Sequence, residues 1–214
     1  MIFRVAISVF AFFAPILSLA GTSQDSVGNV GENCRALSTC TIEYDHLATQ
    51  ESDPFLLIGY VMNSEQARWS QYRRAMKRFR DVRSCLIEEE KEKNNPNLLL
   101  MDWQETGTGR GAEVCIFLIA RSLGSIERHQ QWLTFHKFRV KGLTQIFTQD
   151  FTPDFANQVV SYVSGFWTTE QYRALNSSWF SSLTGLEIVQ GYQVRFQYSD
   201  RQLVVGVRAN TRSK

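Results

Sequence analysis

The residues best suited to chemistry in this chain form a dense cluster of cations. Between Glu65 and Lys91 apolar residues recur at helical spacing, and the polar positions include Arg68, Arg73, Arg74, Lys77, Arg78, Arg80 and Arg83. Asp81 is the one acid between Arg68 and Arg83, and Glu88, Glu89 and Glu90 follow. Clustered arginines make paired hydrogen bonds to carboxylate and phosphate groups. We therefore predict that this basic helix face binds an acidic protein, an anionic polysaccharide or a lipid surface. The alternative is a solvated face with local ion pairs.

A further cation, Arg110, lies in the glycine-rich segment 107–111. Such a segment cradles a phosphate only where it leads from a strand into a helix whose N-terminus faces the anion. The apolar runs 98–104 and 112–120 on either side predict a β-hairpin instead, with this segment as its loop. Arg110 at the tip of that loop is then a contact for the partner.

The histidines do not match a metal motif. His129 and His136 are seven residues apart and His46 is distant, so zinc would need all three histidines, or Glu127 in place of one. We expect half-buried histidines, no metal ion and no cofactor.

Three residues are candidates for catalysing hydrolysis, although the usual motifs are absent. Neither a Gly-x-Ser-x-Gly elbow nor a Ser-x-x-Lys motif occurs. Asp102 and Glu105 could serve as acid and base in a glycan cleft, with His136 as a third candidate. On a strand, however, three-residue spacing sends Asp102 and Glu105 to opposite faces. A hydrolase acting on envelope glycan or peptide is therefore an alternative and not the leading hypothesis.

A carrier of a small ligand or lipid is a second alternative. It would enclose an apolar pocket lined by residues such as Phe117, Phe138 and Trp167.

The N-terminus has the pattern of a cleaved signal peptide. Arg4 precedes an uncharged apolar stretch, and in the sequence Ser18, Leu19, Ala20 the first and last provide the small residues for cleavage. We predict a signal peptide over residues 1–20, a flexible tail over 21–33 and a single domain over 34–214. No later stretch is long and apolar enough to span a membrane. The formal net charge of +2 is too close to neutral to indicate nucleic acid as a partner.

Four cysteines follow the predicted signal peptide. In an exported protein an even number indicates disulfides before metal binding or catalysis. Three pairings are possible for Cys34, Cys40, Cys85 and Cys115. We favour Cys34 with Cys40, which closes a short loop, and Cys85 with Cys115, which could tie a helix to the strand on which it packs.

The remaining elements follow from periodicity and turn residues. The sequence predicts a buried strand at 55–62, a long helix at 65–91, a helix then a strand within 126–140, helices at 152–164 and from 168 or 169 to 182, and a terminal hairpin at 186–198 and 202–209. Strands and helices do not alternate strictly, so we predict an α+β fold with an antiparallel, curved sheet and helices packed mainly on one face.

Together these patterns predict an exported, non-catalytic protein that binds a partner in the cell envelope or outside the cell. The partner is a protein or an anionic polysaccharide, and the leading contact residues are Arg68, Arg73, Arg74, Lys77, Arg78 and Arg110. The periplasm is the favoured location and secretion is the alternative.

Overall fold

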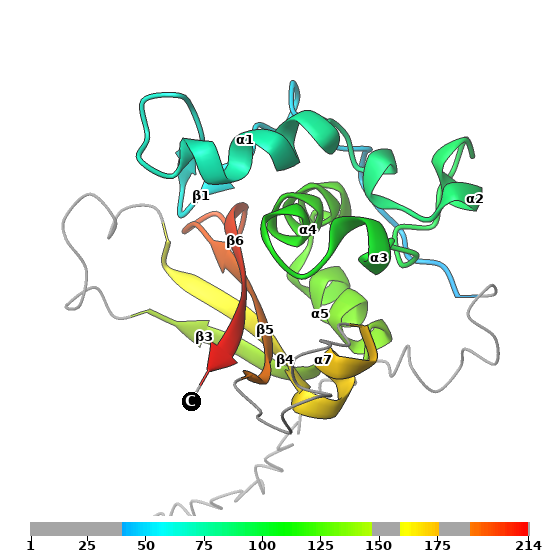
Figure 1. Cartoon of the computed structure of the whole chain (residues 1–214), viewed down its shortest axis with the longest axis vertical. Coiled ribbons are helices and arrows are strands. Elements are labelled where there is room, and N and C mark those ends of the chain that lie inside the picture. Colours follow the sequence, from blue (N-terminus) through cyan, green and yellow to red (C-terminus); the bar gives the residue numbers. More distant parts are fainter. Residues whose placement is uncertain (1–39, 147–158, 176–188, 214) are drawn as a thin grey trace, which may run out of the picture.

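The computed structural model of the chain describes residues 40–146, 159–175 and 189–213 (Figure 1). Helices and antiparallel strands both contribute, as an α+β fold requires. The helices are α1 (Trp69–Arg78), the short 3-10 helix η2 (Arg83–Cys85), α2 (Glu88–Lys91), α3 (Trp103–Thr106), α4 (Arg110–Leu123), α5 (Ile126–Phe135) and α7 (Thr169–Leu175). The strands are β1 (Leu56–Leu57), β2 (Tyr60–Val61), β3 (Arg139–Gln145), β4 (Ser161–Thr168), β5 (Val189–Tyr198) and β6 (Val204–Ser213).

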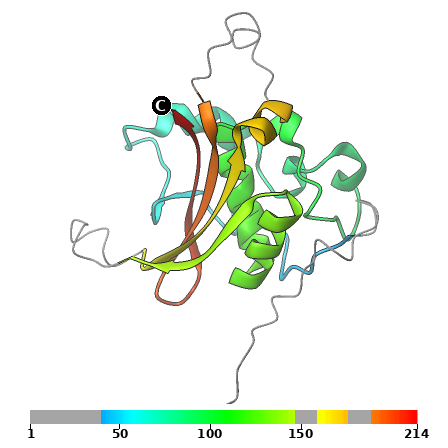
Figure 2. The ribbon, with the colours of Figure 1, turned by 90° about the horizontal axis from the view of Figure 1, so that it is seen from below.

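The main sheet is antiparallel throughout and has the strand order β3-β4-β5-β6. Side chains alternate between its two faces. Val163, Val194 and Phe196 point to the same face and are fully buried. Helices α4 and α5 lie against that face of the curved sheet (Figure 2). The predicted antiparallel sheet with helices on one side is therefore observed in the described residues.

Helix α4 is the centre of the core. It lies between α1 and the sheet (Figure 1), and the segment from Ala112 to Ala120 is buried at every position. A disulfide joins Cys85 of η2 to Cys115 of α4, which confirms that predicted pair, although it links two helices and not a helix to a strand. Cys40 is also disulfide-bonded, and its predicted partner, Cys34, lies outside the described residues.

The predicted hairpin around residues 107–111 is wrong. The run 98–104 contains a turn and the start of α3, and the run 112–120 lies within α4. A short, uniformly apolar run has no periodicity that distinguishes a buried strand from a helix buried on all sides. The glycine-rich segment therefore leads into a helix, contrary to the prediction.

The long helix predicted from Glu65 to Lys91 is also wrong in its extent. Helix α1 ends at Arg78, and the chain continues through Phe79 into η2 and α2. The segment after α1 instead forms isolated bridges with distant residues, Thr49 with Asp81 and Leu86 with Met101. These tertiary contacts override the helical spacing of the apolar residues.

The predictions for three other segments are closer to the structure. The predicted helix then strand within 126–140 is confirmed as α5 and β3, and the terminal hairpin is confirmed as β5 and β6. The predicted buried strand at 55–62 is a small hairpin, β1 and β2, turned by Ile58 and Gly59 at positive φ.

Near the middle of the chain, residues 161–164 belong to strand β4 and not to a helix. Helix α7 begins where predicted, at Thr169. The rest of that predicted helix, the signal peptide and the N-terminal tail lie outside the described residues. Within the part that is described, no helix has the length and apolar character needed to cross a membrane.

Candidate functional site

A surface groove of about 660 Å³ lies between α1 and the turn formed by residues 49–54. We call it the α1 groove. One side consists of Trp69, Arg73, Met76 and Lys77 of α1, continued by Arg80 and Asp81, and the other consists of Thr49, Gln50, Glu51 and Pro54, with Met62 also lining the groove. The groove thus joins the basic helix to a turn some twenty residues earlier in the chain.

Helical spacing explains why apolar and basic side chains share this groove. Residues 73, 76 and 77 of α1 each lie three or four positions from another member of the set 69, 73, 76 and 77, so they project with residue 69 from neighbouring points on one side of the helix. Tyr72 and Ala75 are buried on another side, and α1 packs on α4 there. The side of α1 that lines the groove is therefore only partly buried.

The apolar part of the groove is formed by Met62, Trp69 and Met76. Met62 is buried, whereas Trp69 and Met76 are half-buried and pack against the core. Methionine side chains are flexible and polarisable, so they adapt to ligands of irregular shape. An apolar group can dock here beside the cations.

The cations of this region fall into two sets. Arg78 donates to Glu105 at 3.1 Å, and the guanidinium of Arg83 donates to the carbonyls of Lys91 and Asn94 near the end of α2 at 3.0 and 3.3 Å. The guanidinium groups of Arg78 and Arg83 therefore form hydrogen bonds within the protein.

The second set lines the groove. Arg73, Lys77 and Arg80 are exposed, and within the described ranges their side chains have no carboxylate partner among the ion pairs. Of the two acids that line the groove, Asp81 accepts a hydrogen bond from the backbone N–H of Ser84 at 2.8 Å. The lining therefore carries three cations and two carboxylates, a formal charge of +1.

Gln50 holds the turn against the end of α1. Its backbone N–H donates to the carbonyl of Arg80 at 2.7 Å, and its side-chain amide donates to the carbonyl of Phe79 at 3.3 Å. Its side-chain oxygen accepts from the N–H of Phe55 at 3.1 Å. One side chain thereby fixes the distance between the two sides of the groove.

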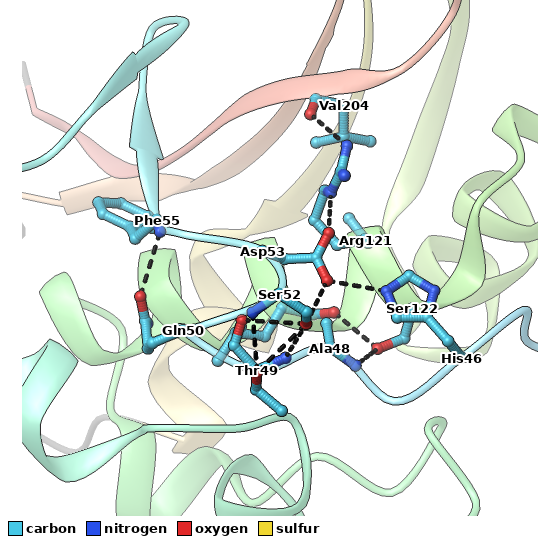
Figure 3. A network of polar contacts seen from close by, with 12 residues as sticks. His46, Ala48, Thr49, Gln50, Ser52, Asp53, Phe55, Arg121, Ser122 and Val204 are labelled. Atoms are coloured by element: carbon cyan, nitrogen blue, oxygen red, sulfur yellow. Dashed lines mark hydrogen bonds and ion pairs between the residues drawn. The ribbon is translucent and has the colours of Figure 1, made fainter.

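Asp53 anchors the same turn to α4 (Figure 3). Its buried carboxylate accepts hydrogen bonds from Arg121 Nε at 2.6 Å, His46 Nε2 at 2.8 Å and Ser52 Oγ at 2.8 Å. Burial alone raises the pKa of Asp53, but these hydrogen bonds and the charge of Arg121 lower it by more. Asp53 is thus a carboxylate in the folded protein, and the turn is rigidly attached before any partner binds.

The six predicted contact residues are not all in one place. Arg73 and Lys77 line the groove, and Arg68 and Arg74 are exposed outside it. Arg78 is paired with Glu105. The structure brings together only part of the predicted set.

Arg110, the sixth residue, belongs to a partly buried network at the start of α4. It donates to Glu113 Oε2 at 2.7 Å and to the hydroxyl of Tyr72 at 3.0 Å. The same oxygen of Glu113 accepts from Tyr72 at 2.6 Å. Burial and the neighbouring Glu113 raise the pKa of Tyr72, which keeps its hydroxyl protonated. Arg110 therefore joins α4 to α1.

The residues proposed for hydrolysis have structural partners. Asp102 caps α3 by accepting from the N–H groups of Gln104 and Glu105. Glu105 pairs with Lys91 at 3.1 Å and with Arg78; burial raises the pKa of its carboxyl, but these partners lower it by more. His136 accepts from Trp103 Nε1 at 3.0 Å, and burial lowers its pKa to about 3.

The other candidates belong to the core. Burial lowers the pKa of His129 to about 4, and its ring bonds Tyr198 and the carbonyl of Ala120. The described residues contain no group of three or more potential metal ligands. Phe117 is fully buried, and Phe138 stacks on Trp167 at 4.2 Å. Neither the α1 groove nor the small cleft near His46 is lined by these three aromatic residues.

Sequence reasoning missed half of the groove. Trp69 and Met76 recur at helical spacing with Tyr72, and such an apolar stripe usually faces the core. The interleaving of Trp69, Arg73, Met76 and Lys77 along one side of α1 is the signal that identifies a mixed binding face. Nothing in the sequence places residues 49–54 opposite them.

No protein-family model, curated protein or solved structure matches the chain.

Proposed function

We propose that this chain is an exported, non-catalytic protein that binds an acidic segment of a partner protein in the α1 groove. The partner belongs to the cell envelope or lies outside the cell, and the periplasm is the favoured location. The observation that carries the proposal is a set of exposed cations, Arg73, Lys77 and Arg80, which have no carboxylate partner among the described residues and lie beside the half-buried Trp69 and Met76.

Charge and apolar contact act together in this proposal. The cations attract carboxylates and speed the encounter, while Trp69 and Met76 bury an apolar side chain of the partner. An anionic polysaccharide satisfies the cations, but it leaves the methionines without an apolar group to contact. The groove therefore favours a protein segment in which acidic and apolar side chains alternate or adjoin.

Export is supported by two independent features. The N-terminal sequence has the order of charged, apolar and small residues of a signal peptide. The Cys85–Cys115 disulfide suits an oxidising compartment.

The alternatives lack comparable support. A hydrolase requires an acid and a base free to act, yet Glu105 is ion-paired and desolvation lowers the pKa of His136 to about 3. A carrier requires a cavity lined by apolar residues, and Phe117, Phe138 and Trp167 pack against other core residues.

The test is a charge-reversal series. The full chain with a C-terminal tag is expressed in a bacterium, and we expect periplasmic protein that begins at Gly21. This protein is used to capture partners from envelope extract. The groove variant carries Arg73→Glu, Lys77→Glu and Arg80→Glu. The control variant carries the same change in charge at exposed positions that do not line the groove: Arg74→Glu, Arg139→Glu and Arg201→Glu.

We expect the groove variant to bind an acidic protein about a hundredfold more weakly than wild type, because three surface charges contribute about 1 kcal/mol each. High salt should weaken wild-type binding as well, and the control should bind normally with an unchanged melting temperature. Retained binding by the groove variant contradicts the proposal. A polysaccharide as the captured molecule, with no acidic protein, replaces the proposed partner class.

A further inference from the structure

Two arginines lie side by side on the face of the sheet that points away from α4 and α5. Arg195 of β5 is directly opposite Arg208 of β6 in the register. The adjacent pair, Phe196 and Val207, is buried, and successive side chains alternate between faces, so the arginine pair points to the outer face. Like charges in directly opposed positions destabilise a sheet. The fold thus tolerates an unfavourable pair at this place.

A third arginine approaches the same point. Arg68 directly precedes α1 and is exposed. Burial is the largest cause that lowers the pKa of Arg208, and the positive charges of Arg68 and Arg195 lower it further. Glu113 and Tyr72 act in the opposite direction but do not restore the ordinary value. The charge of Arg208 is therefore repelled by both Arg68 and Arg195.

None of the three arginines has a carboxylate partner among the ion pairs of the described residues. Glu113 is the acid whose charge acts on Arg208, but it is buried and already accepts hydrogen bonds from other groups. It accepts from Tyr72 at 2.6 Å, from Arg110 at 2.7 Å and from the N–H of Ala209 at 3.0 Å. The repulsion is thus not relieved from within this part of the protein.

An aromatic ring holds the side chain of Arg195 in place. Its guanidinium carbon lies 4.4 Å from the centroid of the Tyr162 ring, a distance at which a cation is attracted to an aromatic face. On β4, the buried Ser164 lies opposite Arg195, and the exposed Lys141 of β3 lies opposite Ser164. A further cation therefore lies across the sheet from the arginine pair.

We propose that Arg68, Arg195 and Arg208, the arginine triad, bind a phosphate group in its dianionic form. Three guanidinium groups can supply paired N–H donors to several oxygens at once. A phosphate group carries close to two negative charges and three strong acceptor oxygens, whereas a carboxylate carries one charge and two oxygens. A phosphate therefore matches the triad better. Arg68 does not line the α1 groove, so this site is additional to the proposed function.

Thermal unfolding of the mature protein tests the site. Inorganic phosphate is titrated against chloride at matched ionic strength, and vesicles containing phosphatidic acid are tested in parallel. We expect phosphate to raise the melting temperature of wild type in a saturable way. Arg195→Gln and Arg208→Gln should each weaken phosphate binding at least tenfold. Both should also raise the melting temperature in phosphate-free, low-salt buffer, because they remove repulsion.

The matched control is Arg201→Gln, an exposed arginine in the turn between β5 and β6, which should respond to phosphate as wild type does. A shift with inorganic phosphate supports a soluble phosphate or phosphoester as the ligand. Triad-dependent vesicle binding without that shift supports a lipid headgroup.

The proposal is overturned if neither probe binds, or if binding is unchanged in Arg195→Gln and Arg208→Gln. The charge-reversed groove variant should keep its phosphate response. The two proposals can therefore fail separately.

Discussion

Asp53 is a buried residue that shapes a surface to which it does not itself contribute. Its carboxylate bonds Arg121, His46 and Ser52 (Figure 3), and its backbone N–H donates to the carbonyl of Thr49 at 2.7 Å. Thr49, Gln50 and Glu51, which line the α1 groove, are thereby held to α4. The sequence does not predict this anchor, because the partner Arg121 lies 68 residues away.

We expect Asp53→Asn to lower the free energy of unfolding by about 3 kcal/mol at pH 7, since Arg121 loses its buried counter-charge. The pKa of Asp53 is lowered in the folded state. Its stabilisation is therefore fully present above the ordinary value of 3.8 and is lost as the pH falls through the lower folded value. The difference between variant and wild type should narrow below pH 3.8.

Urea denaturation followed by tryptophan fluorescence, from pH 7 down to pH 2, measures this difference. Glu51→Gln is the control, because Glu51 is an exposed acid in the same turn, and it should change stability by less than about 0.5 kcal/mol. Equal stability of Asp53→Asn and wild type at pH 7 would show that the anchor contributes nothing.

At the level of secondary structure, exposure decides which elements the sequence predicts correctly. The terminal hairpin β5–β6 alternates apolar and polar residues because one face packs on helices, and the period of two identifies it. Helix α4 is buried on all sides between α1 and the sheet. Its sequence from 112 to 120 therefore shows no helical repeat of apolar and polar residues. The same loss of periodicity makes residues 112–120 resemble a strand and misplaces the glycine-rich segment.

Substitution of Gly111 tests the close approach of α3 and α4. A Cβ atom at Gly111 would lie 2.3 Å from the carbonyl oxygen of Thr106, whereas a Cβ atom at Gly109 meets nothing within 4 Å. We expect Gly111→Ala to lower the free energy of unfolding by about 1–3 kcal/mol, because two backbones must move apart. Gly109→Ala, the matched control, should change it by less than about 0.5 kcal/mol.

Urea denaturation again measures both alanine variants. In the hairpin predicted from the sequence, both glycines belong to one exposed loop, and both substitutions should then be tolerated. Equal stability of the two variants would therefore contradict the close contact between α3 and α4.

Over the whole molecule, a formal net charge of +2 conceals a strong separation of charge. Buried or half-buried acids, among them Asp53, Glu90, Glu105 and Glu113, are paired with cations. Within the part of the chain that the structure describes, Arg73, Lys77 and Arg80 at the groove have no carboxylate partner. The clustering of cations on α1 could be predicted from the sequence, since one helix carries it. The groove could not, because its second side comes from another segment.

Hydroxyl-radical footprinting of the mature protein tests the central claim, occupation of the α1 groove, most directly. Trp69 and Met76 line the groove and are half-buried, whereas Trp103 is half-buried and does not line it. We predict that bacterial envelope extract at low salt protects Trp69 and Met76 from oxidation, that high salt removes this protection, and that Trp103 is oxidised equally throughout. Unchanged oxidation of Trp69 and Met76, under conditions in which the protein demonstrably captures a partner, would contradict the account.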